Sequence, residues 1–270
     1  MKLERYYSEI KKRYGIITRA RGSFLYTQKN VRLTDLFQEG GRAILGWNAP
    51  AYTVFKDVLS KGLSGSFDTA HFARLQKAVS ELLQSKRKIF LFSHKKAAMD
   101  AALSLDAQSS SVYKPFSGVD YSAAKNVVIA PPLPWTNNFW ILAARDFGQE
   151  KDCVASNDCG LATDAAALHS ESFPPALLAA AARAVYDLIA ALKARQEKDF
   201  FIYDKVLVKF FERRACWLRP KVSQEKYDDF VLACLDAGVA ISPDYNADSI
   251  VPFGADKGVL KKMGEIDVGF

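Results

Sequence analysis

A short turn in the middle of the sequence combines residue types that attract anions. An apolar run, Lys88 to Ser93, passes through His94 into the alanine-rich segment Lys95 to Leu105. A buried strand that leads directly into a helix leaves the free N–H groups of the helix N-terminus at the turn, where they can bind an anion. Lys95 and Lys96 stand at the helix end that disfavours cations. An unfavourable position for two cations indicates either an anion-binding role for these lysines or simply a solvated lysine pair at this turn, and the solvated pair is the ordinary interpretation.

Two other positions could take part in chemistry. Lys125 precedes the apolar run Asn126 to Ala130, and a lysine amine can act as a covalent nucleophile when its site activates it. The alternative is an ordinary surface lysine. Phe116, followed by Ser117-Gly118, is the other position, and the ordinary role of such an aromatic residue is core packing.

The cysteines and histidines do not predict a metal site. Cys153 and Cys159 have five residues between them, no second pair follows, and the chain contains only three histidines. This spacing is outside the usual range for zinc. We expect reduced, mostly buried thiols, which are typical of a cytosolic protein.

The composition is that of a soluble globular protein. Of the 270 residues, 49% are hydrophobic and 25% charged, which excludes disorder over the whole chain. The most apolar segment, Ala176 to Leu192, is interrupted by Arg183 and Asp187, so we expect no membrane span, no secretory signal and a cytoplasmic location. The net charge of +7 comes from dispersed basic clusters. No nucleic-acid recognition motif accompanies these clusters, so we do not expect nucleic acid as a partner.

Apolar periodicity predicts an α/β fold. Pro50 and Thr69 mark helix starts, and Gly238 marks a helix end. Helices are expected over residues 51–59, 69–85, 95–105, 176–197 and 223–237. Strands are expected over residues 23–26, 31–33, 88–93, 126–130, 139–144, 206–211, 216–218, 239–243 and 249–252.

Both ends of the sequence resemble one family, the fold-type I pyridoxal-phosphate-dependent transferases, and most closely the class III (ω) aminotransferases. Residues 17–36 are similar to the family's N-terminal hairpin, and Leu45-Gly46-Trp47-Asn48-Ala49-Pro50 is similar to its LGHNHP turn. Residues 227–262 are similar to its closing helix, strand and final turn. The resemblance implies an aminotransferase-like small domain built from residues 1–65 and 195–270, and a reduced central α/β domain over residues 66–194.

The middle of the sequence departs from the family pattern. Residues 92–102 are similar to the SGTEANEAA turn that approaches the cofactor phosphate, but Lys95 and Lys96 replace its small residues. Phe116 stands where an aromatic residue stacks on the cofactor ring. No segment matches the aspartate that pairs with the pyridine nitrogen or the Schiff-base lysine, so Lys125 is the weak remaining candidate. Pyridoxal phosphate is a cofactor by resemblance, but the residues predict that none is bound.

Three functions are compatible with these observations. The first is a catalytically inert relative of the aminotransferases, a pseudoenzyme that binds a small anionic ligand or a partner and forms a homodimer as the family does. The second is an active aminotransferase with a relocated lysine, which would give a coloured protein that a reductant fixes on one lysine. The third is a basic nucleic-acid-binding protein, whose binding would weaken steeply with salt.

Overall fold

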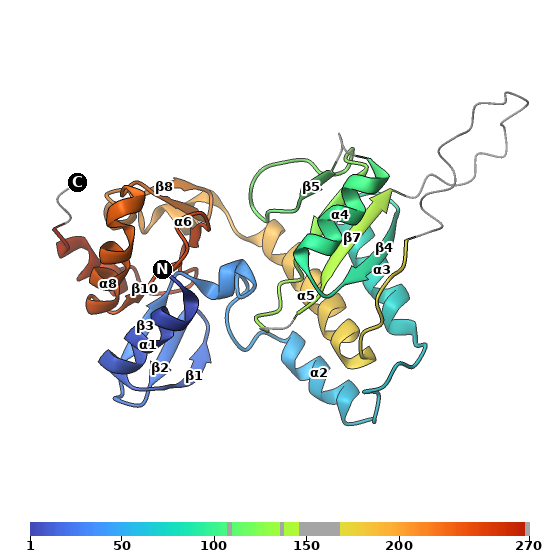
Figure 1. The fold of residues 1–270 in the computed structure, drawn as a ribbon, viewed down its shortest axis with the longest axis horizontal. Coiled ribbons are helices and arrows are strands. Elements are labelled where there is room, and N and C mark those ends of the chain that lie inside the picture. The colour runs from blue at the N-terminus through green and yellow to red at the C-terminus, as the bar shows by residue number, and fades with distance from the viewer. Residues whose placement is uncertain (107–109, 136–137, 146–167, 268–270) are drawn as a thin grey trace, which may run out of the picture. The chain divides into compact units, whose positions relative to one another are not determined.

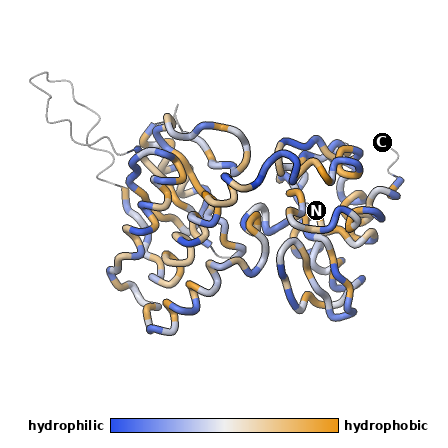
Figure 2. Tube along the Cα trace, turned by 180° about the vertical axis from the view of Figure 1, so that it is seen from behind, coloured by the Kyte–Doolittle hydropathy of each residue, from blue (hydrophilic) through white to orange (hydrophobic). Residues whose placement is uncertain are grey.

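The computed structural model describes residues 1–106, 110–135, 138–145 and 168–267. The chain divides into two compact units (Figure 1). Unit 1 combines Met1–Ala49 with Ala191–Phe270, and unit 2 is the continuous stretch Pro50–Ala190. Hydrophobic residues are spread along the trace of both units (Figure 2), so each unit has apolar side chains for a core of its own.

Unit 2 contains a four-stranded sheet with the order β4-β7-β6-β5. The strand β7 pairs antiparallel with both β4 and β6, and β5 pairs parallel with β6. The strands β4, β6 and β5 therefore run in one direction and β7 in the other. The bounds are β4 Arg87–Phe92, β5 Ser110–Val112, β6 Asn126–Ile129 and β7 Trp140–Arg145.

Both faces of this sheet are buried. On one face, Phe90, Phe92 and Leu142 pack against the alanines of α4 (Lys95–Leu105). Side chains of the opposite face, such as Ile89 and Val127, are 2% exposed or less. Two buried faces explain why these strands are continuous apolar runs rather than alternating patterns. The predicted strands over residues 88–93, 126–130 and 139–144 and the helix over residues 95–105 are confirmed within one or two residues.

The helices α2, α3 and α5 complete unit 2 and extend to its boundary. They span Ala51–Leu59, Ala70–Leu82 and Pro175–Ala194. Val58 of α2 packs against Ala176 and Ala179 of α5, so residues 50–65 group with unit 2. The family resemblance instead places residues 50–65 in the small domain. By length and composition α5 could cross a membrane, but most of its residues are buried among those of the folded chain, as in a core helix.

Unit 1 joins the two ends of the chain in one sheet, with the order β1-β2-β3-β10. The hairpin predicted from the strands over residues 23–26 and 31–33 is confirmed as the antiparallel pair β2–β3. The strand β10 pairs parallel with β3, with Val239 opposite Thr34 and Ala240 opposite Asp35. The bounds are β1 Ile17–Arg21, β2 Phe24–Thr27, β3 Arg32–Asp35, β10 Val239–Ala240, α1 Leu3–Tyr14 and α8 Tyr227–Asp236.

A second, antiparallel sheet of unit 1 has the order β11-β9-β8. The strand predicted over residues 206–211 is wrong, because a short helix, α7, ends at Leu207 and β8 begins only at Phe211. A short apolar run fits a buried helical turn as well as a strand, and Leu207 is fully buried in that turn. The bounds are α6 Glu197–Phe201, α7 Asp204–Leu207, β8 Phe211–Arg214, β9 Trp217–Pro220 and β11 Ser249–Ile250, with 3-10 turns at Gln38–Gly41, Gln224–Lys226, Lys257–Leu260 and Met263–Glu265.

Candidate functional site

Strand register separates the residues singled out in the sequence. Arg87, at the start of β4, lies opposite Arg145, and Asn126 lies opposite Ala144. Lys125, just before Asn126, is therefore at the Arg87 end of the sheet. The other end of β4 is five residues, or about 17 Å, from Arg87 along the strand. Lys95 follows that other end. The structure does not bring Lys125 together with Lys95 and Lys96.

The turn between β4 and α4 already contains a carboxylate. The Ser93 backbone N–H donates to Glu171 Oε1 at 3.0 Å, and the Ser93 hydroxyl donates to the same oxygen at 3.1 Å. The neighbouring residues fix this contact, because Leu91 N–H donates to the Ser170 hydroxyl and Glu171 N–H donates to the Leu91 carbonyl. An internal anion therefore takes up donors at the turn where the family resemblance implies a phosphate.

The three residues expected near this end of the sheet have different surroundings. Lys95 and Lys96 are exposed at the first positions of α4. The Lys95 ammonium lies 5.7 Å from the ring centre of Trp140, which is within the range of a cation–π contact. Phe116 lies in the loop after β5, on the opposite edge of the sheet from β4, and is half-buried with a φ of 58°.

Lys125 is held in a surface ion pair. Its Nζ lies 2.8 Å from Asp106 Oδ2, and its side chain is 53% exposed. Its backbone carbonyl accepts a hydrogen bond of 3.0 Å from the guanidinium of Arg87. Formation of a Schiff base requires a neutral amine, which a desolvated site favours, and Lys125 lies instead in a solvent-exposed ion pair.

The described residues do not fit pyridoxal phosphate. No described lysine is buried, the Ser93 donors are engaged by Glu171, and Lys95 and Lys96 carry long side chains where the family has small residues that let the backbone approach a phosphate. Phe116 could offer a ring face, but it lies beyond β5, on the opposite edge of the sheet from β4 and the start of α4. We therefore derive no step through this cofactor.

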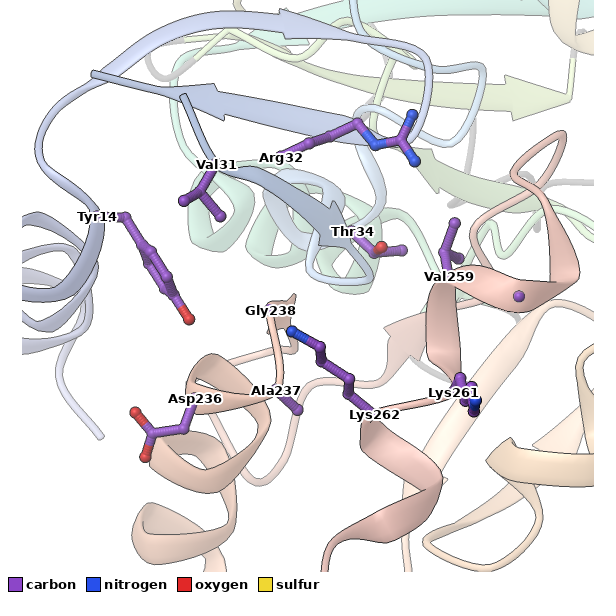
Figure 3. A pocket seen from close by; sticks show the side chains of 11 residues that line it. Tyr14, Val31, Arg32, Thr34, Asp236, Ala237, Gly238, Val259, Lys261 and Lys262 are labelled. Carbon is purple, nitrogen blue, oxygen red and sulfur yellow. The ribbon is translucent and has the colours of Figure 1, made fainter. Parts of the chain in front are cut away.

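A groove of about 530 Å³ lies elsewhere, in unit 1 (Figure 3). We call it the Lys262 groove. Its walls come from the end of α1, from β3, from the end of α8 and from the segment that follows Asp256. It is lined by Tyr14, Val31, Arg32, Thr34, Asp236, Ala237, Gly238, Gly258, Val259, Lys261 and Lys262.

The charge of the Lys262 groove is positive. Its acidic side chain, Asp236, is paired with Arg13 at 2.6 Å. Lys262 reaches across the groove toward Gly238 (Figure 3), and among the described residues no ion pair involves Lys261 or Lys262. Arg32 adds a third cation, with its guanidinium 4.4 Å from the ring centre of Phe24. Such a groove suits an anionic ligand rather than a cation.

Sequence reasoning missed both the groove and Glu171. The basic pair Lys261-Lys262 was visible as a charge cluster, but its position opposite β3 depends on the parallel pairing of β3 with β10. Cys153 and Cys159 lie outside the described residues. Cys216 and Cys234 are buried free thiols, and desolvation raises the pKa of Cys234. Among the described residues, no group of three metal-ligating side chains is found.

Comparisons with known proteins identify the fold. No family model matches the sequence. An uncharacterised protein of Treponema pallidum (strain Nichols) is 29% identical over an alignment that covers 93% of this chain and 93% of its own.

Three solved structures resemble this one. An ornithine aminotransferase from Plasmodium yoelii gives a TM-score of 0.63 at 13% identity, covering 98% of this chain and 97% of its own. The N-acetylornithine aminotransferase of Stenotrophomonas maltophilia K279a gives 0.66 at 13% identity, covering 94% and 95%. An omega-transaminase from Sphaerobacter thermophilus gives 0.63 at 10% identity, covering 92% and 89%. The chain therefore has the α/β fold of the aminotransferases, the fold-type I that the sequence resemblance implies.

Proposed function

We propose that this chain is a catalytically inert protein of aminotransferase fold that binds a small anionic molecule. The observation that carries the proposal is the Glu171 carboxylate on the Ser93 N–H and hydroxyl. A cofactor phosphate at the start of α4, two residues further along the chain, would have the negative charge of this carboxylate beside it. Fold alone does not carry function, and the described lysines lack a desolvated site for Schiff-base chemistry.

The absorption spectrum of the purified protein tests the first half of the proposal. We expect no aldimine band in the visible spectrum after addition of pyridoxal phosphate, and no lysine adduct in mass spectrometry after borohydride reduction. A single reduced adduct would overturn the inert function and identify an active aminotransferase. Lys125→Met distinguishes that lysine from others, and it should change the free energy of unfolding by about 1 kcal/mol or less because it removes only an exposed ion pair.

The Lys262 groove is the proposed ligand site. We expect inorganic phosphate or succinate to bind with an affinity that falls several-fold in Lys262→Gln, since one unpaired cation in the groove is removed. Lys77→Gln is the matched control, because Lys77 is an exposed lysine on α3 of the other unit. Equal affinity in the two variants would show that the anions bind without the groove.

The assembly and the partners follow from the same proposal. A homodimer in the cytoplasm is expected from the resemblance to aminotransferases, and sedimentation at several protein concentrations measures it. Nucleic acid is the competing partner. Its binding would weaken by orders of magnitude between low and physiological salt, so salt-insensitive or absent binding to a duplex would remove that function.

A further inference from the structure

A second cavity of unit 1 contains an acid that forms no ion pair with any described residue. It has a volume of about 150 Å³ and lies between α1 and the sheet of β1, β2 and β3, whose packing is visible in Figure 1. We call it the Asp35 cavity. It is lined by Tyr6, Tyr7, Ile17, Ala20, Leu25, Asp35, Phe37 and Trp47. None of these residues belongs to the Lys262 groove.

The acid is held rigidly at the end of β3. Asp35 is 1% exposed, and its Oδ1 accepts the backbone N–H groups of Phe37 at 3.0 Å and Gln38 at 2.9 Å. Its Oδ2 accepts the indole N–H of Trp47 at 2.7 Å. These three donors hold the carboxylate in place but supply no full positive charge.

No cation of the described residues compensates Asp35. It takes part in none of the ion pairs of the described chain, and the charged group that acts on its pKa is another acid, Glu39. Glu39 itself interacts with Arg42. A buried carboxylate normally has a cationic partner because its desolvation costs several kcal/mol. The lack of a cationic partner for Asp35 among the described residues therefore needs a physical explanation.

The rest of the lining is aromatic. Tyr6 meets Tyr7 edge to face with ring centres 5.4 Å apart, and it meets Phe37 in the same way at 5.9 Å. The Tyr6 hydroxyl is buried and has no hydrogen-bond partner among the described residues. Aromatic faces attract cations, and the effect strengthens when water is excluded.

We propose that the Asp35 cavity binds a small organic ammonium, such as an N-methylated amine. The Asp35 carboxylate supplies the counter-charge, the rings of Tyr6, Tyr7, Phe37 and Trp47 surround the methyl groups, and the Tyr6 hydroxyl faces a polar group of the ligand. A cavity of about 150 Å³ is large enough for benzene, which is close to a trimethylammonium group in size. The site is independent of the Lys262 groove, whose charge has the opposite sign.

Choline and its neutral isostere 3,3-dimethyl-1-butanol test the proposal with the full-length protein. We expect saturable binding of choline by calorimetry, and binding of the neutral alcohol weaker by about tenfold or more, because it lacks the charge that the carboxylate and rings recognise. Asp35→Asn keeps the shape and should reduce choline affinity by a similar factor. Asp68→Asn, at an exposed acid of unit 2, is the matched control and should leave it unchanged.

The second variant locates the ligand. Ala20→Leu extends a side chain into the cavity and should abolish choline binding while leaving the circular dichroism spectrum unchanged. If Asp35→Asn does not fold, the comparison of choline with the neutral alcohol on the unmodified protein decides alone. Equal affinity for the two probes, full affinity in Ala20→Leu, or no saturation by choline would overturn the proposal. These outcomes leave phosphate binding in the Lys262 groove untouched.

Discussion

Tyr6 and Tyr227 are both fully buried tyrosines, but their hydroxyls have different surroundings. The Tyr227 hydroxyl donates to the Ser242 carbonyl at 2.7 Å, whereas the Tyr6 hydroxyl has no partner among the described residues. We expect Tyr6→Phe to leave the free energy of unfolding unchanged or raise it by about 1 kcal/mol, because it removes an unpaired buried polar group. Tyr227→Phe should lower it by about 1–2 kcal/mol. Urea denaturation measures both, and equal losses would contradict the difference in pairing.

Asp35 should make stability depend on pH. Desolvation by burial raises its pKa from 3.8 to about 6, against the opposing effect of the N–H groups of Gln38, Trp47 and Phe37. Between these two pH values the folded protein holds a proton that the unfolded chain has released. The contribution of this group to stability is therefore greatest below pH 4 and falls as the pH rises through 6, by about 3 kcal/mol in total.

The variant Asp35→Asn isolates this effect from the other titrating groups. Its free energy of unfolding, minus that of the unmodified protein, should rise between about pH 4 and pH 6 and then level off, since only the unmodified protein loses stability through this carboxyl. Tyr6, Tyr7 and Glu39 are the other titratable groups beside it. A difference that stays constant across this range would show that Asp35 is ionised in the folded protein throughout.

At the scale of elements, one side chain joins β4 to the loop before β6. Arg87 is 1% exposed, and all five of its side-chain N–H donors have acceptors: its Nε bonds to the Ser85 hydroxyl, and its two amino groups donate to four backbone carbonyls. The four carbonyls belong to Tyr121, Ser122, Ala124 and Lys125. Arg87→Lys should lower the free energy of unfolding by about 3 kcal/mol, because an ammonium cannot reach so many acceptors.

The neighbouring lysine provides the control for Arg87. Lys88→Met, at the next, exposed position of β4, should change stability by about 0.5 kcal/mol or less. Thermal and urea denaturation of the two variants would measure the difference. A mild effect of Arg87→Lys would mean that water satisfies the carbonyls of the loop.

Elements whose apolar pattern is local were predictable from the sequence. The helix α4 begins and ends at the residues expected, Lys95 and Leu105, and α2 follows Pro50 as expected. The contacts of Arg87 and of Glu171 were not predictable, since Ser93 and Glu171 are 78 residues apart. Polar residues carry no periodicity that reports such a partner. The separation of Lys125 from Lys95 was not predictable for the same reason, because strand register alone puts them at opposite ends of one sheet.

At the scale of the whole molecule, the two units differ in how the chain supplies them. Unit 2 is one continuous stretch with its own sheet and buried core. We expect a fragment of residues 50–194, which keeps α5 whole, to fold alone with a cooperative thermal transition. A fragment of residues 1–49 should remain unfolded until residues 191–270 are supplied. Circular dichroism of each fragment, and of the two end fragments mixed, would show this, and an unfolded 50–194 fragment would contradict it.

The parallel pairing of β3 with β10 has a consequence for the timing of protein synthesis. The two strands are separated by about 200 residues, so at 5–20 residues per second the ribosome needs about 10–40 s to make β10 after β3. During that interval the nascent hairpin carries an uncovered strand edge, which can pair with another chain. Unit 2 emerges complete within the same interval. Translation speed over residues 36–240 therefore sets how long the first-made strands wait for β10.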